Sequence, residues 1–219
     1  MNSNPQPSYR WLLWTLALLG CAVDQVGKYG VFKLLYQEAH ANPPLYQAER
    51  SVIPGALKFH IKLTDESLPA GAYPLRTWSG EYQPQVNRGA FLGFGNSEGE
   101  GPNGNLIFAV VSVVAAAAIV WWSTRRSIAR DLVLCVALGL ILSGTLGNLY
   151  DRIIFGGVRD YLYWYFIQES AVFNLADFFL ICGAVLLLAQ ALLSRPARED
   201  QLARETLPPR EVAHAAEMK

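Results

Sequence analysis

Three long stretches of this chain contain almost no charge, and they limit its fold more than any other feature. No Asp, Glu, Lys or Arg occurs in 105–122 or 132–150, and 172–194 contains only Asp177. A helix needs about 20 mainly apolar residues to cross the hydrocarbon core of a bilayer. These stretches therefore predict membrane-spanning helices rather than the core of a small soluble domain.

A fourth span is expected near the N-terminus. Residues 11–23 carry no charge, and the apolar character continues to about residue 35 through Asp24 and Lys28. Arg10 and the apolar run would also suit a secretory signal peptide, but no small-x-small cleavage site follows, so we interpret the run as a retained helix. The predicted spans are residues 11–35, 105–122, 131–150 and 172–194.

The composition argues against several classes of protein. The 18 Lys and Arg balance the 18 Asp and Glu, so no net basic charge favours nucleic acid. The three cysteines lie in apolar runs and do not suggest a disulfide scaffold. None of the three histidines lies in a span, and with no Cys/His cluster we predict neither a metal site nor a cofactor.

The arginines set the expected orientation. Short cytoplasmic loops are enriched in Lys and Arg. Three groups of arginines fall on one side of a four-span protein: before the first span, between the second and third, and after the fourth. They are Arg10, Arg125, Arg126, Arg130, Arg195 and Arg198. Both termini are therefore expected in the cytoplasm, with 36–104 and 151–171 outside. Residues 1–194 form one predicted domain, and 195–219 a polar tail.

The external segment 36–104 is rich in Pro and Gly, and one part of it has a strand pattern. The run from Ser51 to Leu63 ends in alternating apolar and polar residues. This alternation is typical of a strand with one buried face.

Ionisable residues inside a span are costly and usually face a partner or a cavity. Asp24 and Lys28 are four residues apart and can form an ion pair on one helix face. This pair could be purely structural, or it could orient a substrate. Asp177 is the strongest signal, with Asn174 three residues before it, although a polar residue near the membrane surface could also stay hydrated there.

The end of the third span is also polar. Asn148, Asp151 and Arg152 follow Gly144 and Gly147, which permit close helix packing. From the residues alone, this segment could be a small-residue helix contact with interfacial charges, or it could be part of a functional site. A loop aspartate such as Asp160 is ordinarily a turn residue, and the aromatic run 161–166 is typical of an interfacial belt.

Carboxylates are the best-represented candidate catalytic groups in this chain. Two aspartates sharing one proton can act as acid and base and need no metal. A dyad of Ser143 and Lys28 stays open, although no motif supports it. The alternative from another class is a non-enzymatic transporter subunit that uses Asp177 as a proton or cation site.

Four sequence blocks, in order, resemble the lipoprotein signal peptidase (signal peptidase II) family. They are Asp24-Gln-Val-Gly-Lys28, Asn87-Arg-Gly-Ala90, Gly144 to Arg152 together with Asp160, and Phe173 to Asp177. The resemblance implies an all-α membrane protein of four transmembrane helices with a small external β-cradle and an interfacial helix. It also implies a bacterial inner-membrane aspartyl endopeptidase that cleaves prolipoproteins before their diacylglyceryl-modified cysteine.

The resemblance also implies roles for single residues. The catalytic pair is Asp160 and Asp177, and Asp151 is not part of it. The residues that would support the site or bind substrate are Asp24, Lys28, Asn87, Gly144, Asn148, Arg152, Asn174 and Ala176. The expected partners are lipid-modified prolipoproteins and membrane lipids, and the expected state is a monomer. An insertion over about 64–85 departs from the family pattern and puts the shape of the cradle in doubt.

The arginine pattern makes a prediction about topology. Tags at either terminus should be protected from external reagents in intact cells, whereas a cysteine introduced near Gly71 should react with an impermeant maleimide. Labelling of the 123–130 loop from outside would contradict the predicted orientation.

Overall fold

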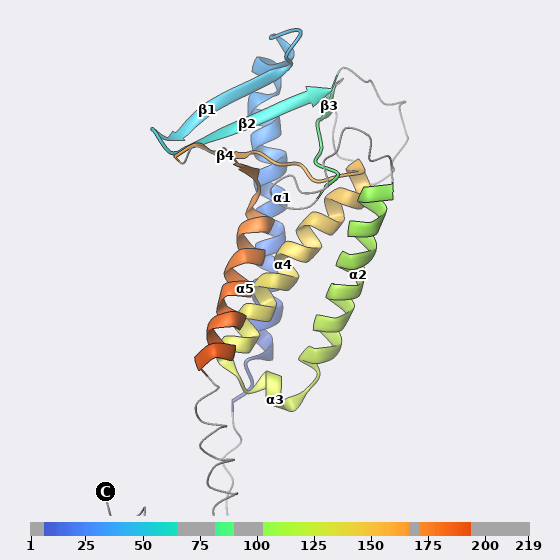
Figure 1. Cartoon of the computed structure of the whole chain (residues 1–219), viewed down its shortest axis with the longest axis vertical. Coiled ribbons are helices and arrows are strands. Elements are labelled where there is room, and N and C mark those ends of the chain that lie inside the picture. The colour runs from blue at the N-terminus through green and yellow to red at the C-terminus, as the bar shows by residue number, and fades with distance from the viewer. Residues whose placement is uncertain (1–6, 65–81, 90–102, 167–170, 194–219) are drawn as a thin grey trace, which may run out of the picture.

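The computed structural model describes residues 7–64, 82–89, 103–166 and 171–193. Four long helices run side by side, and a small sheet covers one end of the bundle (Figure 1). The helices are α1 (Arg10–His40), α2 (Asn103–Ser123), the short α3 (Arg126–Ala129), α4 (Leu132–Phe155) and α5 (Leu175–Leu193). The strands are β1 (Gln47–Ile53), β2 (Leu57–Thr64), β3 (Gln83–Pro84), β4 (Leu162–Trp164) and β5 (Ala171–Phe173).

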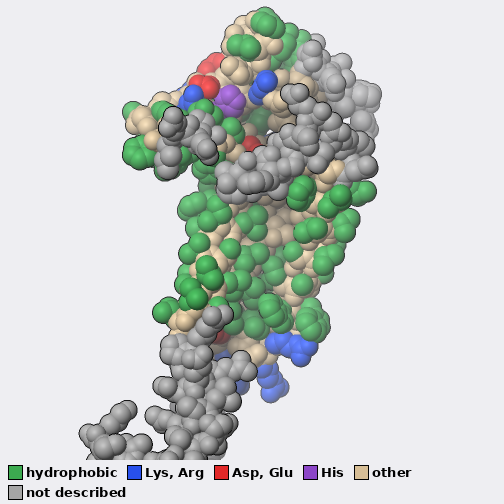
Figure 2. All heavy atoms as spheres, viewed as in Figure 1, with side chains coloured by type: hydrophobic (Ala, Val, Ile, Leu, Met, Phe, Trp, Pro, Cys, Tyr) green, Lys and Arg blue, Asp and Glu red, His purple; other side chains and the backbone are tan. Residues whose placement is uncertain are grey.

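Three of the described helices are long and apolar enough to cross a membrane. They cover Gly104–Ser123, Leu132–Phe155 and Leu175–Leu193, with mean hydropathies of 2.3, 2.1 and 2.2. The outward sides of α2 and α5 expose Leu, Ile, Val and Phe side chains, which form the apolar band in Figure 2. The prediction of three long apolar spans is therefore confirmed by length and composition.

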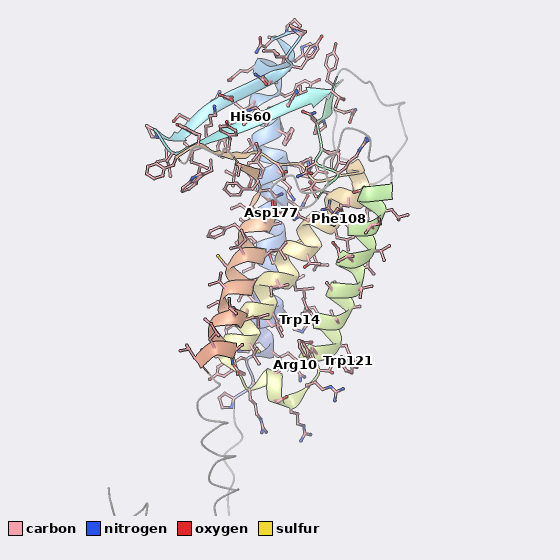
Figure 3. The ribbon with its side chains drawn as sticks, viewed as in Figure 1. Arg10, Trp14, His60, Phe108, Trp121 and Asp177 are labelled. Carbon is pink, nitrogen blue, oxygen red and sulfur yellow. The ribbon has the colours of Figure 1, made fainter. Side chains whose placement is uncertain are left out.

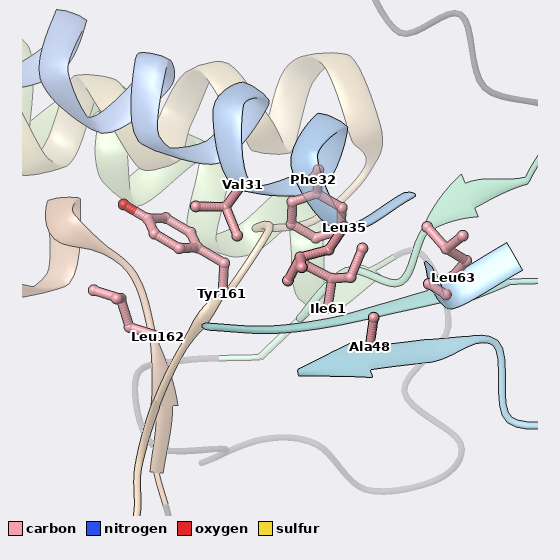
Figure 4. Close-up of a cluster of buried hydrophobic side chains, with 9 residues drawn as sticks. Val31, Phe32, Leu35, Ala48, Ile61, Leu63, Tyr161 and Leu162 are labelled. Atoms are coloured by element: carbon pink, nitrogen blue, oxygen red, sulfur yellow. The ribbon is translucent and has the colours of Figure 1, made fainter. Parts of the chain in front are cut away.

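Helix α1 is longer than the predicted span. Its 31 residues correspond to about 46 Å, which exceeds a hydrocarbon core of about 30 Å. Its final turns pack under the sheet, so they are stabilised by protein contacts (Figure 4). The core there contains Val31, Phe32, Leu35, Ala39, Ala48, Ile61, Leu63, Tyr161 and Leu162.

The sheet confirms the predicted half-buried strand. Residues 57–64 form β2, which pairs with β1, with β4 and, at its end, with β3, all antiparallel. The order across the main sheet is β1-β2-β4-β5. The expected interfacial helix is not found among the described residues of 41–102 and 156–174, and part of the aromatic run forms β4 instead. Most of the insertion, 65–81, lies outside the described residues.

Two helices differ from the predicted spans by several residues at one end. Helix α4 continues past 150 to Phe155, so Asp151 and Arg152 lie in its last turns rather than beyond it. Helix α5 begins at Leu175, because Val172 and its neighbours pair with β4 as strand β5.

Helix α4 lies in the middle of the bundle and contacts α1, α2 and α5. Two of its glycines allow this close approach. A Cβ on Gly144 would collide with the backbone oxygen of Ala176 in α5, and one on Gly147 would lie 2.6 Å from an Asp24 oxygen in α1. The predicted small-residue packing is therefore confirmed, and it brings three helices together at the level of the polar residues.

The two ends of the bundle differ in chemistry. Arg10 and Trp121 lie at the end opposite the sheet, whereas Asp177 lies directly beneath it (Figure 3). The Arg10 guanidinium donates to the Thr124 carbonyl over 3.0 Å, and Arg125 lies over the Trp121 ring. The described arginines of the predicted cytoplasmic side therefore share one end of the molecule.

Glycine substitutions test this packing. Gly144→Ala should destabilise the protein by about 1–3 kcal/mol, the usual cost of overpacking, because its Cβ meets backbone. Gly30→Ala is the matched control, since nothing lies within 4 Å of its added Cβ. Melting temperatures in detergent measure both variants. An unchanged melting temperature for Gly144→Ala would contradict the packing described here.

Candidate active site

Asp177 is fixed at the first turn of α5 by reciprocal backbone contacts with Asn174. The Asn174 side-chain oxygen accepts from the Asp177 amide over 3.1 Å, and an Asp177 oxygen accepts from the Asn174 amide over 3.2 Å. This is the capping-box arrangement, with aspartate in the place usually held by glutamate. Asn174 therefore precedes the helix instead of lying within it, and it still holds Asp177.

Asp160 reaches the same region from the segment after α4. Gly156 ends α4 with a φ of 73°, a left-handed conformation that favours glycine. The chain then returns towards the bundle, where Val158 and Asn87 exchange backbone hydrogen bonds of 2.7 and 2.8 Å. These contacts set the position of the residues that lead into Asp160.

Three asparagine amides orient the two carboxylates. Asn174 donates to Asp160 over 2.7 Å, and Asn87 donates to the other Asp160 oxygen over 3.1 Å. Asn148 donates to Asp177 over 2.8 Å. Asn174 contacts both aspartates, so it links the two carboxylates into one site.

The surroundings of Asp160 change its acidity. Desolvation, followed by the charge of the Asp177 carboxylate, raises the pKa of Asp160 to about 7. The hydrogen bonds from Asn174 and Asn87 act in the opposite direction and only partly offset this rise. A carboxyl group with such a pKa can hold or release a proton near neutral pH, which suits an acid or base in catalysis.

A buried ion pair lies beneath the two aspartates. Lys28 Nζ is 2.8 Å from an Asp24 oxygen, and both side chains are fully buried. The predicted pair on α1 is therefore confirmed. Asp24 also accepts from the Ala176 amide over 2.9 Å, and Lys28 donates to Asn148 over 3.1 Å. The pair thus connects α1 to α4 and to the start of α5.

Asp151 belongs to the same buried group. It is fully buried between Lys28, at 3.6 Å, and Arg159, at 2.9 Å. Asp151 is therefore not an interfacial charge, which was one of the interpretations that the sequence allowed. Sequence reasoning missed Arg159 and also Gln25, whose amide contacts Asp24, Asp151 and the Gly147 carbonyl.

Arg152 is buried at the other side of the site. Its Nη2 donates to the Gly89 carbonyl over 3.3 Å, and its guanidinium lies 5.2 Å from the Phe108 ring centre. Its Nε and Nη1 atoms are buried and make no hydrogen bond within the described residues. These donors are available to an additional acceptor at the site.

The structure brings the polar residues of the four sequence blocks into one region. Gly144 and Ala176 form the close contact between α4 and α5 behind it. The Ser143–Lys28 dyad is not supported, because Lys28 is engaged by Asp24 and Asn148, whereas the Ser143 hydroxyl lies against Gly20.

Comparison with known proteins shows which family this chain resembles. The sequence signature of the signal peptidase (SPase) II family matches residues 74–193 of the chain. The chain belongs to the signal peptidase II family. Family membership argues against the transporter subunit considered above.

Individual relatives are similar over part of their length. The lipoprotein signal peptidase of Rhodopirellula baltica is 40% identical over 119 residues, which are 48% of this chain and 51% of the relative. That of Pseudomonas aeruginosa is 37% identical over 42% of this chain and 56% of the relative. The chain thus spans about half the length of these curated signal peptidases.

Solved structures support the fold of this signal peptidase II family member. A bacterial membrane enzyme solved by the in meso method has a TM-score of 0.63 and 20% identity, and the match covers 89% of this chain and 96% of the other. A second has a TM-score of 0.59 and 22% identity. The arrangement of helices and sheet is therefore shared with known membrane enzymes.

The raised pKa of Asp160 predicts how stability changes with pH. An unfolded aspartate has a pKa of about 3.9, whereas the pKa of Asp160 in the folded protein is about 7. The folded state therefore binds more protons between these values. The free energy of unfolding should fall as pH rises from about 4 to about 7 and then become level.

Melting temperature in detergent, measured across this pH range, tests the prediction. Asp160→Asn should flatten the dependence, whereas Glu38→Gln, at an exposed position, should leave it unchanged. Equal slopes in the wild type and Asp160→Asn would contradict the assignment.

Proposed function

We propose that this protein is a membrane aspartyl endopeptidase that removes signal peptides from bacterial prolipoproteins, cleaving before the diacylglyceryl-modified cysteine. The observation that carries the proposal is the contact of Asn174 with both Asp160 and Asp177, which unites two carboxylates from separate elements. The lipoprotein signal peptidases among its relatives support the substrate class.

The proposed chemistry uses Asp160 and Asp177 as one acid and one base. Two neighbouring carboxylates that hold one proton between them provide both forms at once. The ionised carboxylate takes a proton from water while the water oxygen attacks the scissile carbonyl carbon. The protonated carboxyl group gives its proton to the carbonyl oxygen. As the tetrahedral intermediate collapses, its O–H proton returns to the carboxylate that supplied it and the C–N bond breaks. The leaving nitrogen receives the proton that the other carboxylate took from water.

The buried polar residues would prepare this reaction in two ways. Asn87, Asn148 and Asn174 keep the carboxylates oriented, which limits the rearrangement needed in the transition state. Two buried nitrogen atoms of Arg152, Nε and Nη1, have no acceptor among the described residues, and we assign them to a carbonyl of the substrate peptide.

The depth of the site fits a lipid-modified substrate. Asp177 lies where the apolar band of the bundle meets the sheet (Figures 2 and 3). A diacylglyceryl group anchored in the bilayer would hold the adjacent peptide bond near this level. In this proposal all four long helices span the inner membrane, both termini are cytoplasmic, the site faces outward, and the protein acts as a monomer.

Substitution of the two aspartates tests the proposal. Asp160→Asn and Asp177→Asn each keep the size of the side chain but remove one role in proton transfer. Each should lower turnover of a diacylglyceryl-modified preprotein by at least about a hundredfold, within the range for general acid–base groups. The double variant should be only slightly worse, because residues that act as a unit are not additive.

Loss of the signal peptide on a gel measures turnover, and thermal melting confirms that each variant is folded. Lys58→Gln is a suitable control, because Lys58 pairs with Glu49 on the partly exposed sheet. A folded Asp160→Asn enzyme with nearly wild-type turnover would rule out the proposed pair.

A further inference from the structure

We propose that Arg159 is a positioning residue that holds Asp160 in place by clamping Asp151. The inference rests on the proposed function, since it concerns the same reaction. It adds a residue that neither the sequence motifs nor the expected catalytic pair includes.

Arg159 binds Asp151 through its side chain and its backbone together. Its Nε donates to Asp151 Oδ2 over 3.1 Å, and its Nη2 donates to Oδ1 over 2.9 Å. Its backbone N–H donates to Oδ2 over 2.9 Å. Arg159 directly precedes Asp160 in the chain, so these three bonds tie the peptide leading into Asp160 to the end of α4.

The guanidinium has little freedom to move. Its central carbon lies 4.1 Å from the Tyr29 ring centre and 4.0 Å from that of Phe155. Its Nη2 also donates to Gln25 Oε1 over 3.0 Å, and the residue is fully buried. A planar, delocalised cation can form the bidentate contact and lie against both rings, whereas a lysine ammonium group cannot form the same fork.

Arg159 also affects Asp177 through a chain of contacts. Asp151 faces two cations, Arg159 and, at 3.6 Å, Lys28. Because Arg159 neutralises Asp151, Lys28 can keep its hydrogen bond to Asn148, whose amide orients Asp177. Without Arg159 the buried Asp151 charge would be undercompensated, and it would draw Lys28 away from Asn148.

The charges around the proposed pair define a pH effect. They are Asp24 and Lys28 on α1, Asp151 and Arg152 on α4, and Arg159 before Asp160. Loss of the Arg159 charge makes this environment more negative, so Asp160 ionises less readily. The pH–rate profile should then move to higher pH.

Two substitutions separate charge from geometry. Arg159→Lys keeps the charge but loses the fork, and Arg159→Met removes both. With a diacylglyceryl-modified preprotein, both should lower kcat by about tenfold to a hundredfold, as small displacements of reacting groups do, with little change in KM. Only Arg159→Met should move the pH profile. Arg50→Met is the matched control, because Arg50 forms an exposed pair with Glu38 and should keep wild-type kinetics.

A double variant covers the case in which a single one does not fold. Asp151→Asn with Arg159→Met removes both buried charges, so no unpaired ion remains between them. Its kcat should stay low while its pH profile returns to that of the wild type. Wild-type kcat in a folded Arg159→Lys enzyme, or in the double variant, would overturn the positioning role. Failure of the wild-type protein to cleave the preprotein would instead overturn the proposed function.

Discussion

Four buried charges of cancelling sign hold the end of this bundle nearest the sheet together. Asp24 and Lys28 come from α1, Asp151 comes from α4, and Arg159 comes from the segment that follows α4. An isolated charge in such surroundings would be costly, but paired and hydrogen-bonded charges can be accommodated. Because each charge requires its partners, the group fixes how two helices and the returning chain meet. The asparagines and aspartates of the proposed site are positioned by this group of charges.

Tight helix contacts and the buried charges depend on each other. The absence of a side chain at Gly147 lets Asp24 approach α4, and Asp24 in turn accepts from the Ala176 amide of α5. A larger residue at Gly147 would therefore disturb more than packing, because it would push away a member of the charge group. Apolar contacts alone could not select one rotation of each helix so narrowly, since lipid and leucine are similar surroundings for an apolar face.

Much of this organisation could be predicted from sequence, and the failures have physical reasons. Charge-free runs gave the long apolar helices, and Asp177 stood out because a carboxylate there is expensive. The start of α5 was misplaced because hydropathy cannot distinguish an apolar strand such as β5 from the first turn of a helix. Arg159 was missed because it lies outside the predicted spans, where an arginine is ordinary. Charge counting offered a clue: Asp24, Lys28 and Asp151 leave one negative charge without a partner.

The junction between β5 and α5 couples strand register to helix phase. Phe173 is paired in the sheet, Asn174 caps the helix, and Asp177 lies in its first turn. Each residue of an α-helix turns the chain by about 100°. One residue gained or lost between Phe173 and Asp177 would therefore rotate the carboxylate away from Asn148 while leaving hydrophobicity unchanged. In this region the spacing of residues carries as much information as their identity.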